Sequence, residues 1–158
     1  MTDFMKQIHE KSRKTGEGYT IVMGDIDDFK KVNDEYGHAC GDAALKGVSS
    51  IVIDAVPAEG YVCRWGGEEI LFVIPSSDLD KGTSVAEEIR SNIENKLFEV
   101  NGSKFRITVT FGVCECNGER SYEKAISTAD QYLYCGKQHG KNCVVNKWNY
   151  NELNKKEA

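Results

Sequence analysis

Acidic side chains stand at two places in the sequence where strands are expected to end or begin. Asp25 and Asp27 follow a short apolar run that is typical of a buried strand, and Glu68 and Glu69 follow a pair of glycines. If the first strand pairs beside the hairpin that carries these glycines, Asp25 and Glu68 meet at one end of a sheet. Two carboxylates that close repel each other, and a bound Mg²⁺, which prefers carboxylate oxygens, removes the repulsion.

A simpler interpretation of the same residues remains open at this point. Acidic side chains at strand ends and turns are commonly solvated and without further function. The glycine pair also has a structural role of its own, because it permits the positive φ angles of a tight hairpin. Residue types and spacing alone therefore leave the metal site and the solvated surface as two alternatives.

Hydrophobic periodicity predicts the elements that would position these acids. The helices are expected at 4–11, at 29–36, from a cap at Asp42 to residue 55, at 85–97 and at 122–133. The strands are expected at 19–23, 61–65, 70–74, 98–100, 105–113 and 143–145. Hairpins mixed with helices favour an α+β fold with a mainly antiparallel sheet covered by helices. We expect one domain over 1–158, with a core at about 19–146 and a frayed polar tail at 147–158.

Composition narrows the classes of function. The formal net charge of −5 argues against a nucleic-acid polymer as partner, because phosphate neutralisation needs a basic face. Six cysteines are present, but none forms a C-x-x-C pair, so the spacing typical of zinc sites is missing. The N-terminus lacks the apolar core of a signal peptide, and no apolar run is long enough for a membrane span. We expect reduced thiols, a cytoplasmic location and no membrane contact.

Three ordered blocks of residues resemble the GGDEF domain family, the catalytic domains of diguanylate cyclases. The first runs from Asp25 through Asp42 as DIDDFKKVNDEYGHACGD, and the second is RWGGEEI, at 64–70. The third is the closing helix and turn, with Ala129-Asp130, Leu133-Tyr134, Gly136-Lys137 and Gly140-Lys141-Asn142. The resemblance covers about 19–145 and implies a palm-like, ferredoxin-type sheet.

The resemblance also implies roles at the positions that match. Asp25, Glu68 and the backbone carbonyl of Ile26 would hold the metal, and Glu69 is the adjacent acid whose part in catalysis is less defined. Lys30 and Arg64 would stabilise charge on the phosphates during transfer. The remaining residues would bind substrate. The backbone N–H groups of Asp28 and Phe29 and the side chains of Lys137 and Lys141 would contact the terminal phosphates. Asn33 and Asp42 would recognise guanine. Without the family, the residues alone favour Asp42 as a helix cap and Asn33 as a polar helix position over guanine recognition.

The implied activity is condensation of two GTP molecules into cyclic di-GMP, with two Mg²⁺ or Mn²⁺ ions assisting attack of a 3′-hydroxyl on an α-phosphate. One domain holds one GTP, so a catalytic homodimer, which need not be permanent, is implied. The chain departs from the family pattern at Ile70, where the signature has Phe, and at Pro57–Gly60, where the R-x-x-D product-inhibition motif is missing. The usual opening motif, an Asp-x-Leu-Thr segment, is also missing, which suggests a fragment of a longer protein with a fused sensor domain.

Two other functions compete with this interpretation. A degenerate domain could bind GTP as a regulatory module without turnover, and a related palm-fold enzyme could make a different cyclic nucleotide. A product assay with GTP and Mg²⁺ separates the first from a cyclase, and competition between GTP and ATP separates the second.

Overall fold

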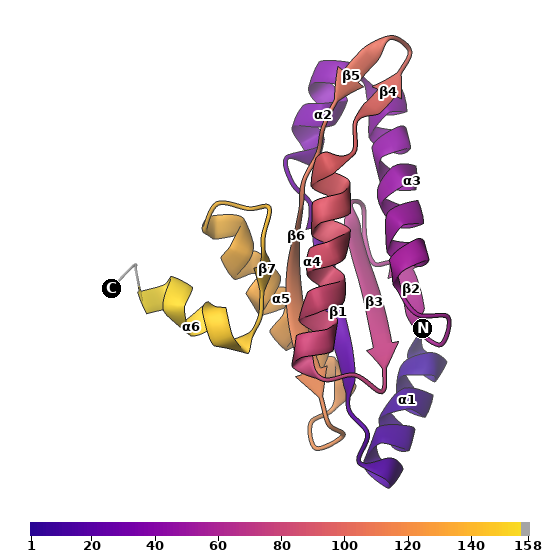
Figure 1. The fold of residues 1–158 in the computed structure, drawn as a ribbon, viewed down its shortest axis with the longest axis vertical. Helices are drawn as coiled ribbons and strands as arrows, with labels where there is room; N and C mark the ends of the chain where they lie inside the picture. Colours follow the sequence, from indigo (N-terminus) through magenta and orange to yellow (C-terminus); the bar gives the residue numbers. More distant parts are fainter. Residues whose placement is uncertain (156–158) are drawn as a thin grey trace.

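A five-stranded sheet forms the centre of the computed structural model, which describes residues 1–155 (Figure 1). Its order is β2-β3-β1-β6-β7, from β1 (Tyr19–Ile26), β2 (Tyr61–Arg64), β3 (Glu69–Pro75), β6 (Val109–Cys116) and β7 (Val144–Val145). All neighbours are antiparallel except β6 and β7, which are parallel. The order β2-β3-β1-β6 is that of a ferredoxin-type sheet, so the predicted fold class is confirmed.

Six helices surround this sheet: α1 (Thr2–Thr15), α2 (Phe29–Tyr36), α3 (His38–Ala55), α4 (Leu79–Asn95), α5 (Tyr122–Gln138) and α6 (Lys147–Lys155). Alternation along β1 decides which face each helix covers, because successive strand side chains point to opposite sides. Val22 packs in the core beneath α3 and α4, whereas Ile21 and Met23 pack in the core beneath α1 and α5. The sheet is thus buried on both faces (Figure 1).

The second predicted hairpin is only partly right. β4 (Phe98–Val100) pairs with β5 (Ser103–Phe105) in a separate two-stranded sheet, and the chain is irregular at 106–108 before β6 begins. The predicted continuous strand at 105–113 is therefore wrong. In this irregular segment Arg106 donates hydrogen bonds to the carbonyls of Glu94 and Asn95 at the end of α4.

Three further predictions about elements are corrected. The helix at 38–55 begins four residues before Asp42, so Asp42 is not its cap. Leu97 lies beyond the end of α4 and is exposed. Residues 147–155 form α6 instead of a frayed tail. The Asn146 side-chain oxygen accepts a hydrogen bond from the Trp148 amide, as an N-cap residue does. The Tyr150 ring also packs against that of Tyr132, with 4.9 Å between the ring centroids. The last three residues of the predicted tail, 156–158, lie outside the described residues.

Candidate active site

The end of β1 and the start of β3 bring the acidic residues together. In the antiparallel register Asp25 lies opposite Glu69, and the Ile26 amide donates to the Glu68 carbonyl at 3.4 Å. The predicted pairing of the first strand with the glycine hairpin is therefore confirmed. Glu68 and Glu69 are half-buried at this end of the sheet, directly after the turn at Gly66 and Gly67.

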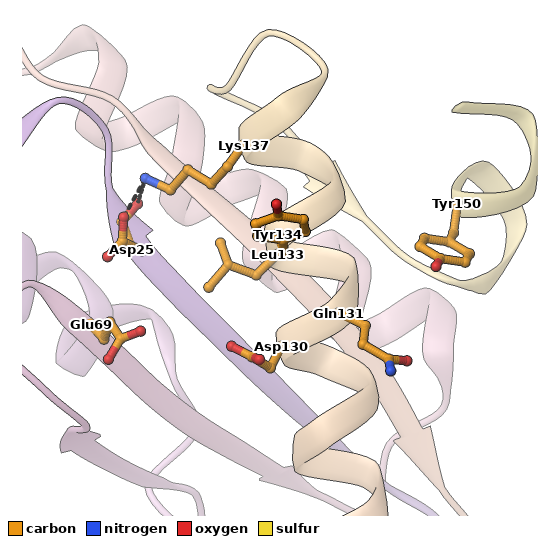
Figure 2. A pocket seen from close by; sticks show the side chains of 8 residues that line it. All are labelled: Asp25, Glu69, Asp130, Gln131, Leu133, Tyr134, Lys137 and Tyr150. Carbon is orange, nitrogen blue, oxygen red and sulfur yellow. Dashed lines mark hydrogen bonds and ion pairs between the residues drawn. The ribbon is translucent and has the colours of Figure 1, made fainter. Parts of the chain in front are cut away.

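One lysine from α5 reaches into this acidic cluster. The Lys137 ammonium forms ion pairs with the carboxylates of Asp25 and Asp27, at 2.7 Å for Asp27, and donates to the Asp25 carbonyl at 3.0 Å (Figure 2). Lys137 can do so because α5 approaches β6 very closely. A Cβ atom on Gly112 would lie only 2.0 Å from the Ala129 carbonyl oxygen, so only glycine permits this contact.

Negative charge at the site exceeds what Lys137 offsets. Burial raises the pKa of Asp25 above its usual value, although Lys137 opposes that rise. The pKa of Glu69 is also raised, first by burial and then by the neighbouring charges of Asp25, Asp130 and Glu68. Both shifts indicate a place where another cation would be favoured.

The metal-ligating side chains are few. Among residues 1–155, no three histidine, cysteine, aspartate or glutamate side chains are gathered closely enough to form a metal site by themselves. A divalent ion here would need further oxygen ligands from the backbone or from substrate, which is how Mg²⁺ is commonly held beside phosphates. The donor set of Asp25, Glu68 and the Ile26 carbonyl fits that arrangement and remains a prediction.

Asp27 has a role that the sequence analysis did not assign. Its carboxylate is buried and accepts hydrogen bonds from the hydroxyls of Thr108 and Thr110 at 2.7 Å, from Lys137 at 2.7 Å and from the Asn142 amide at 3.0 Å. Each carboxylate oxygen thus has two donors, which is a fully satisfied buried acid. Asp27 joins β1, β6, α5 and the loop before β7 at the edge of the acidic cluster.

The Asn142 side chain extends this polar network to α4. It accepts from Arg90 at 2.7 Å and donates to Glu94 at 2.7 Å, and Arg90 also pairs with Glu94. The carboxylate of Glu87, which pairs with Arg90 at 2.7 Å, and then that of Glu94 raise the pKa of the Arg90 guanidinium above its ordinary value. In the segment Gly140-Lys141-Asn142, the role predicted from sequence belongs to the lysine, but Asn142 makes the contacts that fix the loop before β7.

The glycine turn is braced by Arg64. The Arg64 guanidinium donates to the carbonyl of Gly67 at 2.8 Å and to that of Gly66 at 3.2 Å. Gly66 is needed beside Glu69, because a Cβ atom there would lie 2.5 Å from the Glu69 carboxylate. Arg64 was predicted to stabilise phosphate charge; in the structure it holds the turn that presents Glu68. Lys30, assigned the same role, is exposed on α2.

The junction of β1 and α2 is the place where the phosphate cradle is predicted. Asp28 adopts a left-handed conformation with φ 53°, and the first amides that bond back to it are those of Lys31 and Val32. The amides that precede Lys31 have no earlier helical turn to bond to, so they are open to an anion. Lys141 lies beside this junction, with its ammonium 2.8 Å from the Asp28 carboxylate.

The two residues assigned to guanine lie on neighbouring helices. Asn33 is half-buried on α2, and Asp42 is exposed on α3. Gly41 separates them: a Cβ atom there would lie 2.0 Å from the Asn33 side-chain oxygen, so the amide sits directly over the glycine. Because Asp42 does not cap α3, the structural explanation for this acid is removed, and guanine recognition stays a prediction.

A pocket of about 370 Å³ opens beside Asp25, Glu69 and Lys137 (Figure 2). The same helix that carries Lys137, α5, also lines the pocket with Asp130 and the exposed ring of Tyr134, and Tyr150 comes from α6 (Figure 2). The sequence analysis gave these three side chains no role. Asp130 lies two turns and Tyr134 one turn before Lys137 on α5, which is the spacing that could have marked them as its neighbours.

Comparison with known proteins was made for sequence and for structure. The chain matches the family model described as "Diguanylate cyclase, GGDEF domain" over residues 1–143. It is 36% identical over 144 residues to diguanylate cyclase DosC of Escherichia coli (strain K12), covering 90% of this chain and 31% of that protein. It is 37% identical over 130 residues to diguanylate cyclase A of Treponema denticola, covering 82% of this chain and 35% of that protein.

Solved structures agree in fold. The GGDEF domain of DgcB from Caulobacter crescentus, solved in complex with c-di-GMP, superposes with a TM-score of 0.87 at 26% identity, covering 91% of this chain and 84% of that one. The active GGEEF domain of a diguanylate cyclase from Vibrio cholerae gives 0.84 at 25% identity, covering 92% of each chain. The chain spans about a third of the length of the curated relatives it matches. In the described part of the chain, no helix has the length and apolar character needed to cross a membrane.

Proposed function

Because the chain belongs to the GGDEF family of diguanylate cyclase domains, we propose that it condenses two GTP molecules into cyclic di-GMP. In each of two equivalent steps, a ribose 3′-oxygen forms a bond to the α-phosphorus of the other GTP. The bond from that phosphorus to the bridging oxygen breaks, pyrophosphate leaves, and the hydroxyl proton passes to solvent or to a nearby base. The observation that carries this proposal is the excess of carboxylate charge where β1 meets the glycine hairpin.

Divalent cations fit this end of the sheet. Asp25 and Glu68 would hold them together with the Ile26 carbonyl, and we propose two Mg²⁺ or Mn²⁺ ions in each active site. When bound, such ions neutralise phosphate charge and favour loss of the proton from the attacking hydroxyl. The fit rests on hard oxygen donors, on the raised pKa of Asp25 and on a lysine ammonium that already lies among the acids.

The chain's own residues then bind and orient the nucleotide. The open amides at Asp28 and Phe29 and the ammonium of Lys141 would receive the terminal phosphates. Asn33 and Asp42 would hold the guanine edge, since a carboxylate accepts from the N1–H and exocyclic amine that adenine does not offer in that arrangement. Arg64 fixes the turn before Glu68 and so maintains the distance between the two metal-binding acids.

Lys137 and Glu69 complete the proposed site. When the acids bind metal, the Lys137 ammonium would leave Asp25 and contact the phosphates. Glu69, with its raised pKa, faces the pocket on the side away from the guanine residues and is a candidate to accept the hydroxyl proton. Two domains must face each other to supply both nucleotides, so we propose a catalytic homodimer.

The surroundings of the domain are also part of the proposal. Since the curated relatives are about three times as long as the matched segment, we propose that this domain works fused to a sensor in a longer protein. GTP is a cytoplasmic nucleotide, so we propose that the domain faces the cytoplasm.

The test is a product assay with a matched pair of variants. The protein is incubated with GTP and Mg²⁺ at several protein concentrations, and the mixture is chromatographed for cyclic di-GMP. We expect product from the wild type and from Glu59→Gln, an exposed acid in the turn before β2, but none from Glu68→Gln. GTP binding without product at high protein concentration would instead support the regulatory module.

A further inference from the structure

The proposed phosphate cradle contains an acidic side chain that does not cap the helix. Asp28 stands at the start of α2, where the open amides are expected to face terminal phosphates, so its carboxylate has the same sign of charge as the substrate. Its carboxylate makes no capping hydrogen bond to the helix. The negative charge at residue 28 therefore needs another explanation.

The carboxylate of Asp28 is bound to two lysines. The Lys141 ammonium donates to Asp28 Oδ1 at 2.8 Å, and the Lys31 ammonium lies 3.1 Å from the same oxygen. Together they hold the pKa of the Asp28 carboxyl below its usual range, with Lys141 as the larger cause, and Asp28 in turn raises the pKa of Lys141. The pair is partly exposed, with side chains 38% and 40% accessible, so solvent and nucleotide can reach it.

Lys141 is held in this place by its backbone. It adopts a left-handed conformation with φ 62°, and its amide donates to the Gly136 carbonyl at 3.0 Å at the end of α5. The neighbouring Asn142 is fixed to Asp27, Glu94 and Arg90. The ammonium of Lys141 thus remains near the cradle whatever its partner is, and only the end of the side chain has to move for it to change partners.

We propose that Asp28 is an internal anion that the terminal phosphates of GTP displace from Lys141, so that residue 28 sets the affinity for the triphosphate. This inference deepens the proposed function and rests on it. A terminal phosphate offers more charge and more acceptor oxygens than a carboxylate, so the exchange favours the nucleotide. Part of the binding free energy is nevertheless lost in separating the Lys141–Asp28 pair and in placing phosphate beside a carboxylate.

Asp28→Asn tests this with little change in the backbone. Asparagine tolerates the left-handed conformation as aspartate does, and it removes only the charge. We measure binding of 3′-deoxyguanosine triphosphate with Mg²⁺ by calorimetry, because this nucleotide lacks the attacking hydroxyl and cannot be condensed. The variant should lower the Kd about two- to fivefold, as expected for an exposed ion pair. The corresponding monophosphate, which lacks terminal phosphates, should show no such gain.

Two further variants identify the cause. Asp34→Asn removes the same charge from an exposed position of the same helix and should leave the Kd unchanged. Lys141→Gln should weaken binding of the triphosphate. Adding Asp28→Asn to Lys141→Gln should improve the affinity by less than Asp28→Asn improves that of the wild type, because the ion pair that GTP has to separate is already absent.

Each other outcome overturns the proposal. An unchanged or raised Kd for Asp28→Asn would show that the carboxylate does not compete with phosphate, and so would a gain of equal size in Asp34→Asn or with the monophosphate. A wild type that binds no nucleotide would also exclude it. Because the readout is binding, a chain that binds GTP but makes no product would refute the cyclase proposal and still decide this one.

Discussion

Asp25 shows how a functional acid can lower the stability of its own fold. Burial raises its pKa, and Lys137 compensates only in part. The folded protein therefore binds a proton to Asp25 more readily than the unfolded chain does. Stability falls as pH rises from the unfolded pKa, about 3.9, through the folded one, and the full penalty is present at neutral pH.

Replacing this acid should separate stability from activity. In EDTA at pH 7, Asp25→Asn should melt at a higher temperature than the wild type, and the difference should shrink as the pH falls, because protonation of Asp25 in the folded protein removes the charge that burial disfavours. The same variant should lose at least about a hundredfold in cyclic di-GMP synthesis. Thermal melts across this pH range check the first expectation, and a lower melting temperature for the variant at pH 7 would contradict it.

Gly41 is a second residue whose importance is visible only in three dimensions. An alanine Cβ atom there would lie 2.0 Å from the side-chain oxygen of Asn33, so Gly41→Ala must displace that amide. Because alanine favours helix, the fold should tolerate the change. We expect GTP binding to weaken about tenfold, or ~1.4 kcal/mol, together with poorer discrimination against ATP.

The comparison with Asn33→Ala makes the Gly41 test specific. If the glycine matters through Asn33, the double variant should bind GTP no worse than Asn33→Ala alone, since the two changes remove one interaction. Calorimetric titrations with GTP and ATP measure both effects. Additive losses would show that Gly41 acts by another route, for example by shifting α2 as a whole.

At the scale of elements, the buried carboxylate of Asp27 connects strands and helices that the hydrophobic core alone would not hold in register. Its donors come from β6, from α5 and from the loop before β7. The oxygen atoms of a buried carboxylate need all these donors, because an unpaired buried charge is strongly unfavourable. The network thus specifies how closely these elements approach at the active-site end.

Thr110→Val probes this connection at nearly constant shape. Thr110 is fully buried, and its hydroxyl donates to Asp27 at 2.7 Å, so the valine variant should lose about 1–3 kcal/mol in free energy of unfolding. Thr128→Val is the matched control, because the Thr128 hydroxyl bonds only back to the Lys124 carbonyl of its own helix. Urea denaturation measures both; equal losses would contradict a special role for the Asp27 contact.

The sequence predicts most elements because their apolar periodicity matches their burial, as in the stripe of Val48 and Val52 on α3. It fails where a single polar contact decides the backbone. Arg106 binds the end of α4 directly after the small hairpin, and Asn146 caps α6, and neither contact is visible in the hydrophobic pattern of the sequence. The contacts of Asp27 and Asn142 could likewise not be predicted, because their partners are distant in the sequence.

The whole molecule places its chemistry at one end of a sheet that is buried on both faces. The two hydrophobic cores leave the ends of β1 and β3 as the place where polar groups gather, and α2, α3 and α5 carry the residues that we propose bind nucleotide. If each domain binds one GTP, as proposed, a second domain has to supply the other nucleotide.

This requirement predicts a second-order dependence on protein. If two domains must meet for each product, pyrophosphate release per milligram should rise in proportion to protein concentration while the dimer is a minority species. A series of dilutions at saturating GTP, followed with a coupled pyrophosphate assay, checks it. A specific activity that stays constant over the range in which sedimentation shows monomer would contradict the facing-domain arrangement.

The contacts of Asp27 have one more consequence, which concerns the order of folding. Thr108, Thr110, Lys137 and Asn142 are separated from it by 81, 83, 110 and 115 positions. Contacts of such separation form only after most of the intervening chain has been arranged, because closing long loops is entropically unfavourable. The Asp27 contacts cannot all form on a chain emerging during synthesis until the residues up to Asn142 have been made, so we expect this end of the sheet to be fixed only late in folding.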